Sequence, residues 1–377
     1  MVTICRVKAA SVGAAFLAAS LIGGVSSGQN PANPAGKPPE PWPDAAALAV
    51  RRQTAERRPL FAANDPLSFT LTADFKAVQR DRNPESTRTY PATLSIAGPD
   101  GSSQDIPMRI RTRGHSRRLP STCTFAPLRL EFESNPVGTV FEGQRALKLG
   151  THCRDVDEYE QYVYREYLVY RISNLITPRS FRARLASATY VEAATKKTVA
   201  ARAALFLEDD DDVARRLEGR IDDAQKITFR SVDPDTITLL TVFAYMIGNT
   251  DMSMFRQHNI RLVRVPSGVL YPVPYDFDYS GLVHTRYAIP DKQFGLVTVR
   301  ERLYRGPCRT AADFERIFVR MREVKADILA LYDSVPPLEE KYRRDARQYL
   351  EQFYRTIDRP NDVKRAFLDN CGNRAGM

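Results

Sequence analysis

The segment that decides the fold is a series of short alternating runs between Leu67 and Leu149. The first run, Ser68–Thr72 (SFTLT), places polar and apolar residues at alternate positions, as do Pro91–Ile96 (PATLSI) and Met108–Arg111 (MRIR). This period of two is typical of strands with one buried face. The turn sequence at Gly98–Gly101 (GPDG) predicts a hairpin between the second and third runs.

Further strands and one long helix follow this segment. Leu128–Phe132 and Ala146–Leu149 alternate in the same way, and Ala188–Val191 and Ala201–Leu207 read as two more strands. Between these pairs, residues 157–176 repeat apolar side chains at helical spacing, and Thr177-Pro178 ends the helix.

The second half of the chain is mainly helical. Pro234 suits the first turn of a helix whose buried stripe continues to Ile247. A strand pair, Asn259–Val263 and Val269–Val273, flanks a Pro-Ser-Gly turn, and long amphipathic helices are predicted over Thr310–Tyr332 and Pro337–Ile357. We therefore expect an α+β fold with a β-rich N-terminal lobe over residues 60–208 and a mainly helical C-terminal lobe over residues 209–377.

The N-terminus has the pattern of a secretory signal peptide. Arg6 and Lys8 precede an apolar run over Ala9–Gly23, and small residues follow up to Gly28. We assign residues 1–28 to this signal, with an uncleaved N-terminal anchor as the alternative, and residues 29–59 to a proline-rich linker. No later segment is long and apolar enough to cross a bilayer, so we expect a periplasmic or secreted protein without a membrane span after cleavage.

Charge and cysteine content narrow the class further. The formal net charge of +10 allows an anionic partner, although an arginine-rich soluble surface explains it equally, and no basic-aromatic nucleic-acid motif is present. Four cysteines follow the signal, which predicts two disulfides in an exported chain. Three pairings are possible; we favour Cys123 with Cys153 and Cys308 with Cys371 because these partners are nearer in sequence.

Four oxygen-bearing side chains surround the predicted C-terminal hairpin. Asp251 follows the end of a buried helix, Asn259 begins the first strand, and Asp276 and Asp278 lie just past the second strand. Because a hairpin brings these ends together, the side chains can converge into a site suited to Mg²⁺ or Mn²⁺. Ordinary turn chemistry is the alternative, since Asn and Asp are common in turns.

The same residues carry a resemblance to a known family. Asn249-x-Asp251, His258-Asn259 and Pro274-x-Asp276-x-Asp278 resemble, in this order, motifs of the CotH family of kinase-like proteins, named for a spore-coat protein. The resemblance implies a two-lobed atypical protein-kinase-like fold that transfers phosphate from ATP to protein hydroxyls. It implies that Asp251 is the catalytic residue, and that Asn259 and Asp276, assisted by Asp278, hold the metal.

Candidate phosphate-binding residues come from the β-rich half. The segment around Arg111, Arg113 and Gly114 looks like an Arg-Gly segment of that family, and the arginines could contact nucleotide phosphates. The lysine that the family places before the strand at Leu128 is absent, which makes Lys148 the best substitute, paired with Glu160 or Glu166. A solvated strand face explains Lys148 equally well. The acidic run Glu208–Asp212 is interpreted as the start of a helix rather than as a metal site.

Two functions follow from these expectations. The first is an exported phosphotransferase that uses ATP and a divalent cation to modify a protein or envelope hydroxyl. The second is a catalytically inactive module that binds an anionic envelope component, because ATP is scarce outside the cytoplasm. The sequence leaves the acceptor, the phosphate donor, the oligomeric state and the role of the last hundred or so residues open.

Overall fold

The folded unit begins with a helix that precedes the barrel. The computed structural model describes residues 40–98, 100–224 and 226–372, and the chain divides into a unit of residues 1–42 and a unit of residues 43–377. The predicted signal peptide and the first part of the predicted linker lie outside the described residues. Within the predicted linker, Ala45–Glu56 forms helix α1, with Leu48 and Ala55 buried, so the folded unit starts before Leu60.

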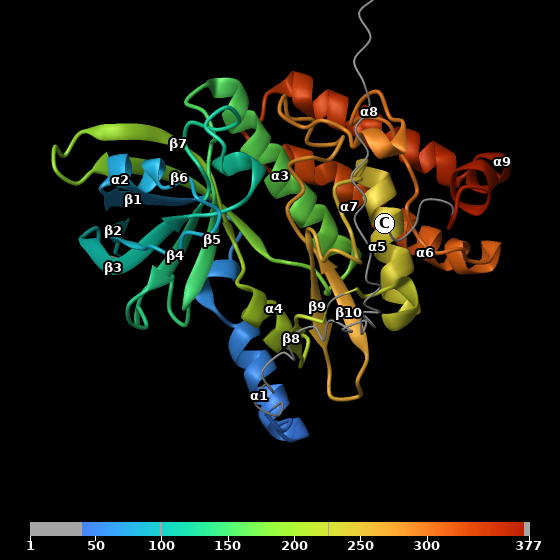
Figure 1. The fold of residues 1–377 in the computed structure, drawn as a ribbon, viewed down its shortest axis with the longest axis horizontal. Coiled ribbons are helices and arrows are strands. Elements are labelled where there is room, and N and C mark those ends of the chain that lie inside the picture. The colour runs from blue at the N-terminus through green and yellow to red at the C-terminus, as the bar shows by residue number, and fades with distance from the viewer. Residues whose placement is uncertain (1–39, 99, 225, 373–377) are drawn as a thin grey trace, which may run out of the picture. The chain divides into compact units, whose positions relative to one another are not determined.

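Seven strands form a closed barrel in the order β1-β2-β3-β4-β5-β7-β6 (Figure 1). They are β1 (Leu67–Ala73), β2 (Tyr90–Ala97), β3 (Ser103–Thr112), β4 (Leu128–Phe132), β5 (Ala146–Gly150), β6 (Ala183–Glu192) and β7 (Thr198–Leu207). The hairpin predicted between Pro91–Ile96 and Met108–Arg111 is confirmed as the antiparallel pair β2–β3. All other pairs are antiparallel except β1 with β6, whose parallel pairing closes the sheet.

The predicted kinase-like fold is wrong. Its N-terminal lobe would be an antiparallel sheet, whereas here the first strand pairs in parallel along its full length with β6, which lies more than a hundred residues later in the chain. Closure leaves these strands without a free edge. The structure is a mixed seven-stranded barrel with helices and a separate three-stranded sheet, rather than a sheet lobe followed by a helical lobe.

Alternating side chains fill the barrel, as the sequence pattern requires. Phe69 and Leu71 of β1 are buried with Tyr190 of β6 and Phe206 of β7. Phe69 and Phe206 lie 5.0 Å apart between ring centroids, a distance typical of packed aromatic pairs. The predicted Cys123–Cys153 disulfide is present and joins the segment before β4 to the residues after β5.

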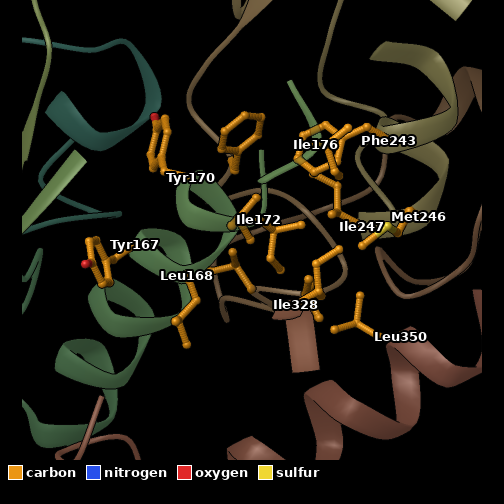
Figure 2. Close-up of a cluster of buried hydrophobic side chains, with 14 of the residues drawn as sticks. Tyr167, Leu168, Tyr170, Ile172, Ile176, Phe243, Met246, Ile247, Ile328 and Leu350 are labelled. Carbon is orange, nitrogen blue, oxygen red and sulfur yellow. The ribbon is translucent and has the colours of Figure 1, made fainter. Parts of the chain in front are cut away.

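The long helix α3 (Asp157–Ile176) connects the barrel to the remaining helices. Its residues are buried on nearly all sides, with Tyr170 and Ile172 at most 1% exposed. Figure 2 shows Leu168 and Ile172 of α3 directed toward Ile247, Ile328 and Leu350 of other helices. A single apolar cluster therefore extends from the barrel-facing side of α3 to the C-terminal helices.

The other helices and the small sheet complete the unit. The helices are α2 (Phe75–Arg80), α4 (Asp210–Arg216), α5 (Pro234–Ile247), α6 (Ala311–Glu323), α7 (Lys325–Ala330), α8 (Glu340–Ile357) and α9 (Pro360–Val363). The helix predicted over Thr310–Tyr332 is divided into α6 and α7 at Val324. None of the described helices combines the length and apolar character that a bilayer crossing requires.

The small sheet places the candidate site. It consists of β8 (Arg220–Asp222), β9 (Ile260–Arg264) and β10 (Leu270–Pro274) in the order β10-β9-β8, and β9–β10 is the hairpin that the sequence predicts. The second predicted disulfide, Cys308–Cys371, is also present and ties the segment before α6 to the residues after α9.

Candidate functional site

A cavity of about 580 Å³ lies between the end of β3 and the β9–β10 hairpin. We call it the arginine–aspartate cavity. Its polar lining residues are Arg111, Arg113, His115, Ser116, Arg117, Arg118, Asp251, Arg256, Gln257, His258, Asn259, Arg261, Tyr275, Asp276, Asp278 and Tyr279. The cavity therefore brings together the predicted residues Asp251, Asn259, Asp276 and Asp278 with both predicted arginines.

Asp251 is held in a fixed orientation by its neighbours. Its Oδ1 atom lies 3.0 Å from Nε2 of His258, and the Asn259 amide donates to its Oδ2 at 3.0 Å. The same Asn259 amide donates to the backbone oxygen of Asp251 at 2.8 Å. The Asp251 side chain remains 35% exposed, so a ligand in the cavity can reach this oriented carboxylate.

The chain reaches this position through a tight end of helix α5. Gly248 ends the helix with φ +66°, and a Cβ at this position would lie 2.1 Å from the Tyr349 hydroxyl. Only glycine fits both the left-handed backbone and the close approach. Asp251 follows three residues later, where its backbone N–H donates to the Asn249 side chain at 3.0 Å.

Backbone strain gathers around the same cavity. Gln257, Asn259 and Asp276 all have positive φ, at 48°, 57° and 62°, and all three line the cavity. Non-glycine residues seldom adopt this region, and such residues gather at functional sites because the surrounding structure must hold them there. For Asp276, the backbone N–H donates to the Tyr170 hydroxyl at 2.9 Å.

Asp276 and Asp278 have different surroundings. Asp278 is buried, lies 3.5 Å from Arg117 and accepts a hydrogen bond from the Tyr287 hydroxyl at 3.0 Å. The Asp276 carboxylate makes no hydrogen bond or ion pair with the part of the chain that the structure describes. Asp276 is thus the carboxylate available to a ligand, whereas Asp278 is already engaged.

Two buried carboxyl groups, Asp278 and Glu166, lie close enough to Asp276 to interact with its charge. Burial, followed by the charge of Asp276, raises the pKa of Asp278 well above its usual value. Burial also raises the pKa of Glu166 to about 7, although Arg117, at 3.7 Å, opposes the shift. Arg117 is therefore the buried cation that compensates two carboxylates, and its own pKa lies above the usual value: burial lowers it, and neighbouring Tyr287 and carboxylate groups outweigh burial.

These residues do not form a complete metal site on their own. Among the described residues, no group of three or more His, Cys, Asp or Glu side chains is arranged to hold a metal ion. The predicted set of Asn259, Asp276 and Asp278 contains only two carboxylates, one of which is engaged with Arg117. Such a set fits Mg²⁺, which usually takes one or two carboxylates and completes its shell with water and substrate phosphates.

The arginines of the cavity differ in how far they are paired. Arg111 contacts Glu131 at 3.3 Å, and Arg261 contacts Asp210 at 2.8 Å. Within the described residues, the guanidinium groups of Arg113 and Arg256 make no hydrogen bond or ion pair. Two unpaired guanidinium groups beside a carboxylate site are suited to bind the oxygens of a phosphate or carboxylate ligand.

Lys148 does not have the partner that the sequence suggests. It forms an ion pair with Asp210 rather than with Glu160 or Glu166, and Glu166 faces Arg117 instead. Lys148 is 5% exposed, and burial, partly offset by Asp210, lowers its pKa to about 8. Lys148 does not line the cavity, so in this conformation it does not contact a phosphate bound there.

The sequence did not indicate the roles of two residues near the site. Arg117 belongs to an arginine cluster in the sequence, and nothing there distinguishes it as the one that becomes buried between Glu166 and Asp278. Asp210 begins α4, as the acidic run predicts, and it also links Lys148 to Arg261. Their roles depend on contacts between segments far apart in the chain, for which a local pattern carries no signal.

No protein-family model matches the chain, and a search of curated proteins finds no match either. The function must therefore be argued from the geometry of the arginine–aspartate cavity.

Proposed function

We propose that the protein is a phosphotransferase that binds the phosphates of a nucleoside triphosphate in the arginine–aspartate cavity. The observation that carries the proposal is the juxtaposition of the oriented Asp251 carboxylate with the Asp276 carboxylate and the Arg113 guanidinium group, both of which lack a partner among the described residues. This proposal rests on the site and does not require a kinase-like fold.

Each residue has a distinct role in the proposed reaction. Asp251 orients an acceptor hydroxyl and accepts its proton as the hydroxyl oxygen forms a bond to the terminal phosphorus. The bond from that phosphorus to the bridging oxygen breaks, and the nucleoside diphosphate leaves with the electron pair. Arg113 and Arg256 bind phosphate oxygens and stabilise the charge that develops on them.

A divalent cation fits the residues that face the phosphates. Asp276 and Asn259 would hold Mg²⁺ or Mn²⁺ together with the nucleotide, and the ion would neutralise phosphate charge. Asp278 would assist indirectly, because it is buried and already engaged with Arg117. We therefore expect the cation to bind with the nucleotide and only weakly alone.

The acceptor is proposed to be a protein or envelope hydroxyl outside the cytoplasm. Two disulfides are typical of proteins from oxidising compartments. We propose that a signal peptide directs export and that the protein acts in the periplasm or in the medium.

A second function is favoured by one observation. Within the described residues the guanidinium groups of Arg113 and Arg256 are unpaired, so the cavity could hold an anionic envelope polymer without turnover.

Nucleotide binding separates the two functions. The mature chain is mixed with ATP, with MgCl₂ or MnCl₂, and with both, and the melting temperature is recorded with release of labelled phosphate. The phosphotransferase predicts a larger shift for ATP with metal than for either alone, together with transfer. A shift with polyphosphate or teichoic acid but not with ATP and metal supports the binding module and overturns the phosphotransferase.

A further inference from the structure

A smaller cavity, of about 240 Å³, lies against the same loop that carries Asp251. It shares Asp251, Arg256 and His258 with the arginine–aspartate cavity, so the hydrogen-bonded pair of Asp251 and His258 lines both spaces. The residues that line only the smaller cavity are candidates for groups that act on Asp251 without contacting a phosphate. They are Thr250, Met252, Ser253, Asp291, Gln293, Phe294 and Arg305.

The backbone around Asp251 receives its hydrogen bonds from side chains. The stretch follows Gly248, where helix α5 ends, and residues 250–252 belong to neither a helix nor a strand. The Asp251 N–H donates to the Asn249 side chain at 3.0 Å, and the Asp251 oxygen accepts from the Asn259 amide at 2.8 Å. The position of the Asp251 carboxylate therefore depends on the side chains that hold this loop.

Arg305 supplies the hydrogen bonds on either side of Asp251. Its Nη1 atom donates to the Thr250 oxygen at 2.6 Å and to the Met252 oxygen at 2.8 Å. Thr250 and Met252 are the immediate neighbours of Asp251 in the chain, so a single charged nitrogen restrains the backbone before and after this carboxylate. Hydrogen bonds from a charged donor are about twice as strong as neutral ones, which makes Arg305 an important restraint on the loop.

The guanidinium group of Arg305 is itself held in place. It lies 4.1 Å from the centroid of the Phe294 ring, and Phe294 is 4% exposed. Burial lowers the pKa of Arg305, while the charges of Asp291 and Asp251 oppose this shift, so the cation lies within electrostatic reach of the Asp251 carboxylate. A planar guanidinium group that is stacked on a buried ring is a well-oriented donor.

We infer that Arg305 is a positioning residue, which holds the Asp251 carboxylate in place for the acceptor hydroxyl. Arg305 does not line the arginine–aspartate cavity, whose phosphate-facing arginines are Arg113 and Arg256, so its effect on the reaction passes through Asp251. The kinetic consequence rests on the proposed phosphotransferase function. The structural part, the restraint on the Asp251 loop, can be measured without turnover.

Arg302 offers a matched control for the test. Its guanidinium group donates to the backbone oxygens of Met246 and Tyr349 at 3.2 Å and 2.5 Å, and it lies 3.7 Å from the centroid of the Tyr349 ring. These are the same kinds of contact that Arg305 makes, but they join helices α5 and α8 rather than the Asp251 loop. Arg302→Gln and Arg305→Gln therefore lose equivalent interactions, and only the second variant should displace Asp251.

Hydrogen exchange, measured by NMR on the ligand-free protein, reports on the loop directly. The backbone N–H groups of Ser253 and His258 donate to each other's carbonyl oxygens at 3.1 Å and 2.9 Å, just after the segment that Arg305 restrains. We expect Arg305→Gln to exchange at these two positions at least about tenfold faster than the wild type, since hydrogen bonds to a charged group are lost. Arg302→Gln should leave both exchange rates unchanged.

Phosphate transfer from labelled ATP with MgCl₂ tests the kinetic consequence. Arg305→Gln should lower kcat by about 10²-fold, the cost of misplacing a reacting group by about 1 Å. The KM for ATP should stay unchanged, because Arg305 does not face the phosphates. Arg305→Lys should recover most of kcat, since one nitrogen makes both backbone contacts in the wild type and an ammonium group can replace it. Arg302→Gln should retain the wild-type kcat.

Three outcomes overturn the inference. Exchange at Ser253 and His258 is no faster in Arg305→Gln than in Arg302→Gln. The wild type transfers phosphate, and Arg305→Gln does so with the same kcat. Or Arg305→Gln raises the KM for ATP and leaves kcat unchanged, as loss of a phosphate-binding residue would.

Two further results remain informative. If the wild type transfers no phosphate, the proposed function fails, and the exchange rates alone decide whether Arg305 holds the Asp251 loop. If Arg305→Gln does not fold, Phe294→Leu takes its place, because it removes only the ring against the guanidinium group. Phe294→Leu should raise the exchange rates at Ser253 and His258 severalfold, and unchanged rates in that variant overturn the inference.

Discussion

Asp251 and His258 are hydrogen-bonded across 3.0 Å, although they are seven positions apart in the chain. The intervening loop folds back on itself through the bridge between Ser253 and His258, which returns the imidazole to the carboxylate. The pair thereby turns a flexible loop carboxylate into an oriented one. Orientation is what a group that receives a proton from an acceptor hydroxyl requires.

Replacing the carboxylate tests this role directly. Asp251→Asn keeps the shape of the side chain and removes its ability to accept a proton, so phosphate transfer should fall by about 10²–10⁴-fold. Nucleotide binding should change little, because Arg113 and Asp276 remain. Radiolabel transfer and the ATP-induced shift in melting temperature measure the two effects. Asp105→Asn on β3, outside the cavity lining, is the control, and transfer at the wild-type rate by Asp251→Asn would remove Asp251 from the mechanism.

The same pair predicts a pH dependence. The hydrogen bond to the Asp251 carboxylate, ahead of the opposing effect of burial, raises the pKa of His258. The charged pair therefore stabilises the fold fully below the unfolded pKa of about 6.5, and this contribution disappears as pH rises through the higher folded pKa.

Chemical denaturation checks the sign. His258→Gln should reduce the free energy of unfolding by up to about 1 kcal/mol near pH 5.5 and by less near pH 8.5, since the pair is partly exposed. NMR titration should give a lower His258 pKa in Asp251→Asn than in the wild type. An unchanged midpoint would mean that another group sets the shift.

Local patterns predicted much of the site. The convergence of Asp251, Asn259 and Asp276 follows from a hairpin between Asn259 and Pro274 whose ends must meet, and the structure places all three in one cavity. The helix predicted over residues 157–176 has the same limits as α3. It could be predicted because its period of 3.6 residues is visible within the segment itself.

Barrel closure had no such signal. The parallel pairing of β1 with β6 matches Leu67 to Ala186 and Ala73 to Glu192, over more than a hundred residues of chain. An alternating strand has the same sequence pattern whether its neighbour is adjacent in sequence or distant, so the pattern could not distinguish a closed barrel from the predicted antiparallel sheet lobe. The partner of Lys148 was missed for a related reason, since Asp210 reaches it from the start of another helix.

The two disulfides should contribute to stability without being part of the cavity. The Cys308–Cys371 bond closes a separation of 63 residues, and removing such a constraint commonly costs about 2–4 kcal/mol. The double variant Cys308→Ser/Cys371→Ser should therefore lower the free energy of unfolding by this amount and leave ATP binding intact in the folded protein.

Thiol labelling gives an independent check on the same bonds. Alkylation without reduction should leave the four paired cysteines unmodified, and labelling at Cys123 or Cys371 in folded wild-type protein would contradict the pairing.

The Asp276 carboxylate has no hydrogen-bond or ion-pair partner among the described residues, so it should destabilise the ligand-free protein. Burial, with a contribution from Asp276, raises the pKa of Glu166 from about 4.5 to about 7. Between these values the folded protein retains a proton that the unfolded chain releases, so the free energy of unfolding falls as pH rises through this window. Asp276→Asn removes the neighbouring charge and should lower the Glu166 pKa. The free energy of unfolding should then decrease less as pH rises through this window. Asn also tolerates the positive φ of 62° at this position.

We therefore expect Asp276→Asn to unfold at a higher temperature than the wild type near pH 8 when no ligand is present. Adding ATP with MgCl₂ should raise the melting temperature of the variant less than that of the wild type, because the variant lacks the carboxylate proposed to bind the cation together with the nucleotide. Glu166→Gln serves as the control for the titrating group: it should flatten the same pH window while leaving Asp276 in place. If Glu166→Gln retains the full pH dependence, Glu166 is not the titrating group. If Asp276→Asn lowers the melting temperature of the ligand-free protein, and ATP with MgCl₂ still raises that temperature as much as in the wild type, then Asp276 stabilises the fold and does not hold a cation.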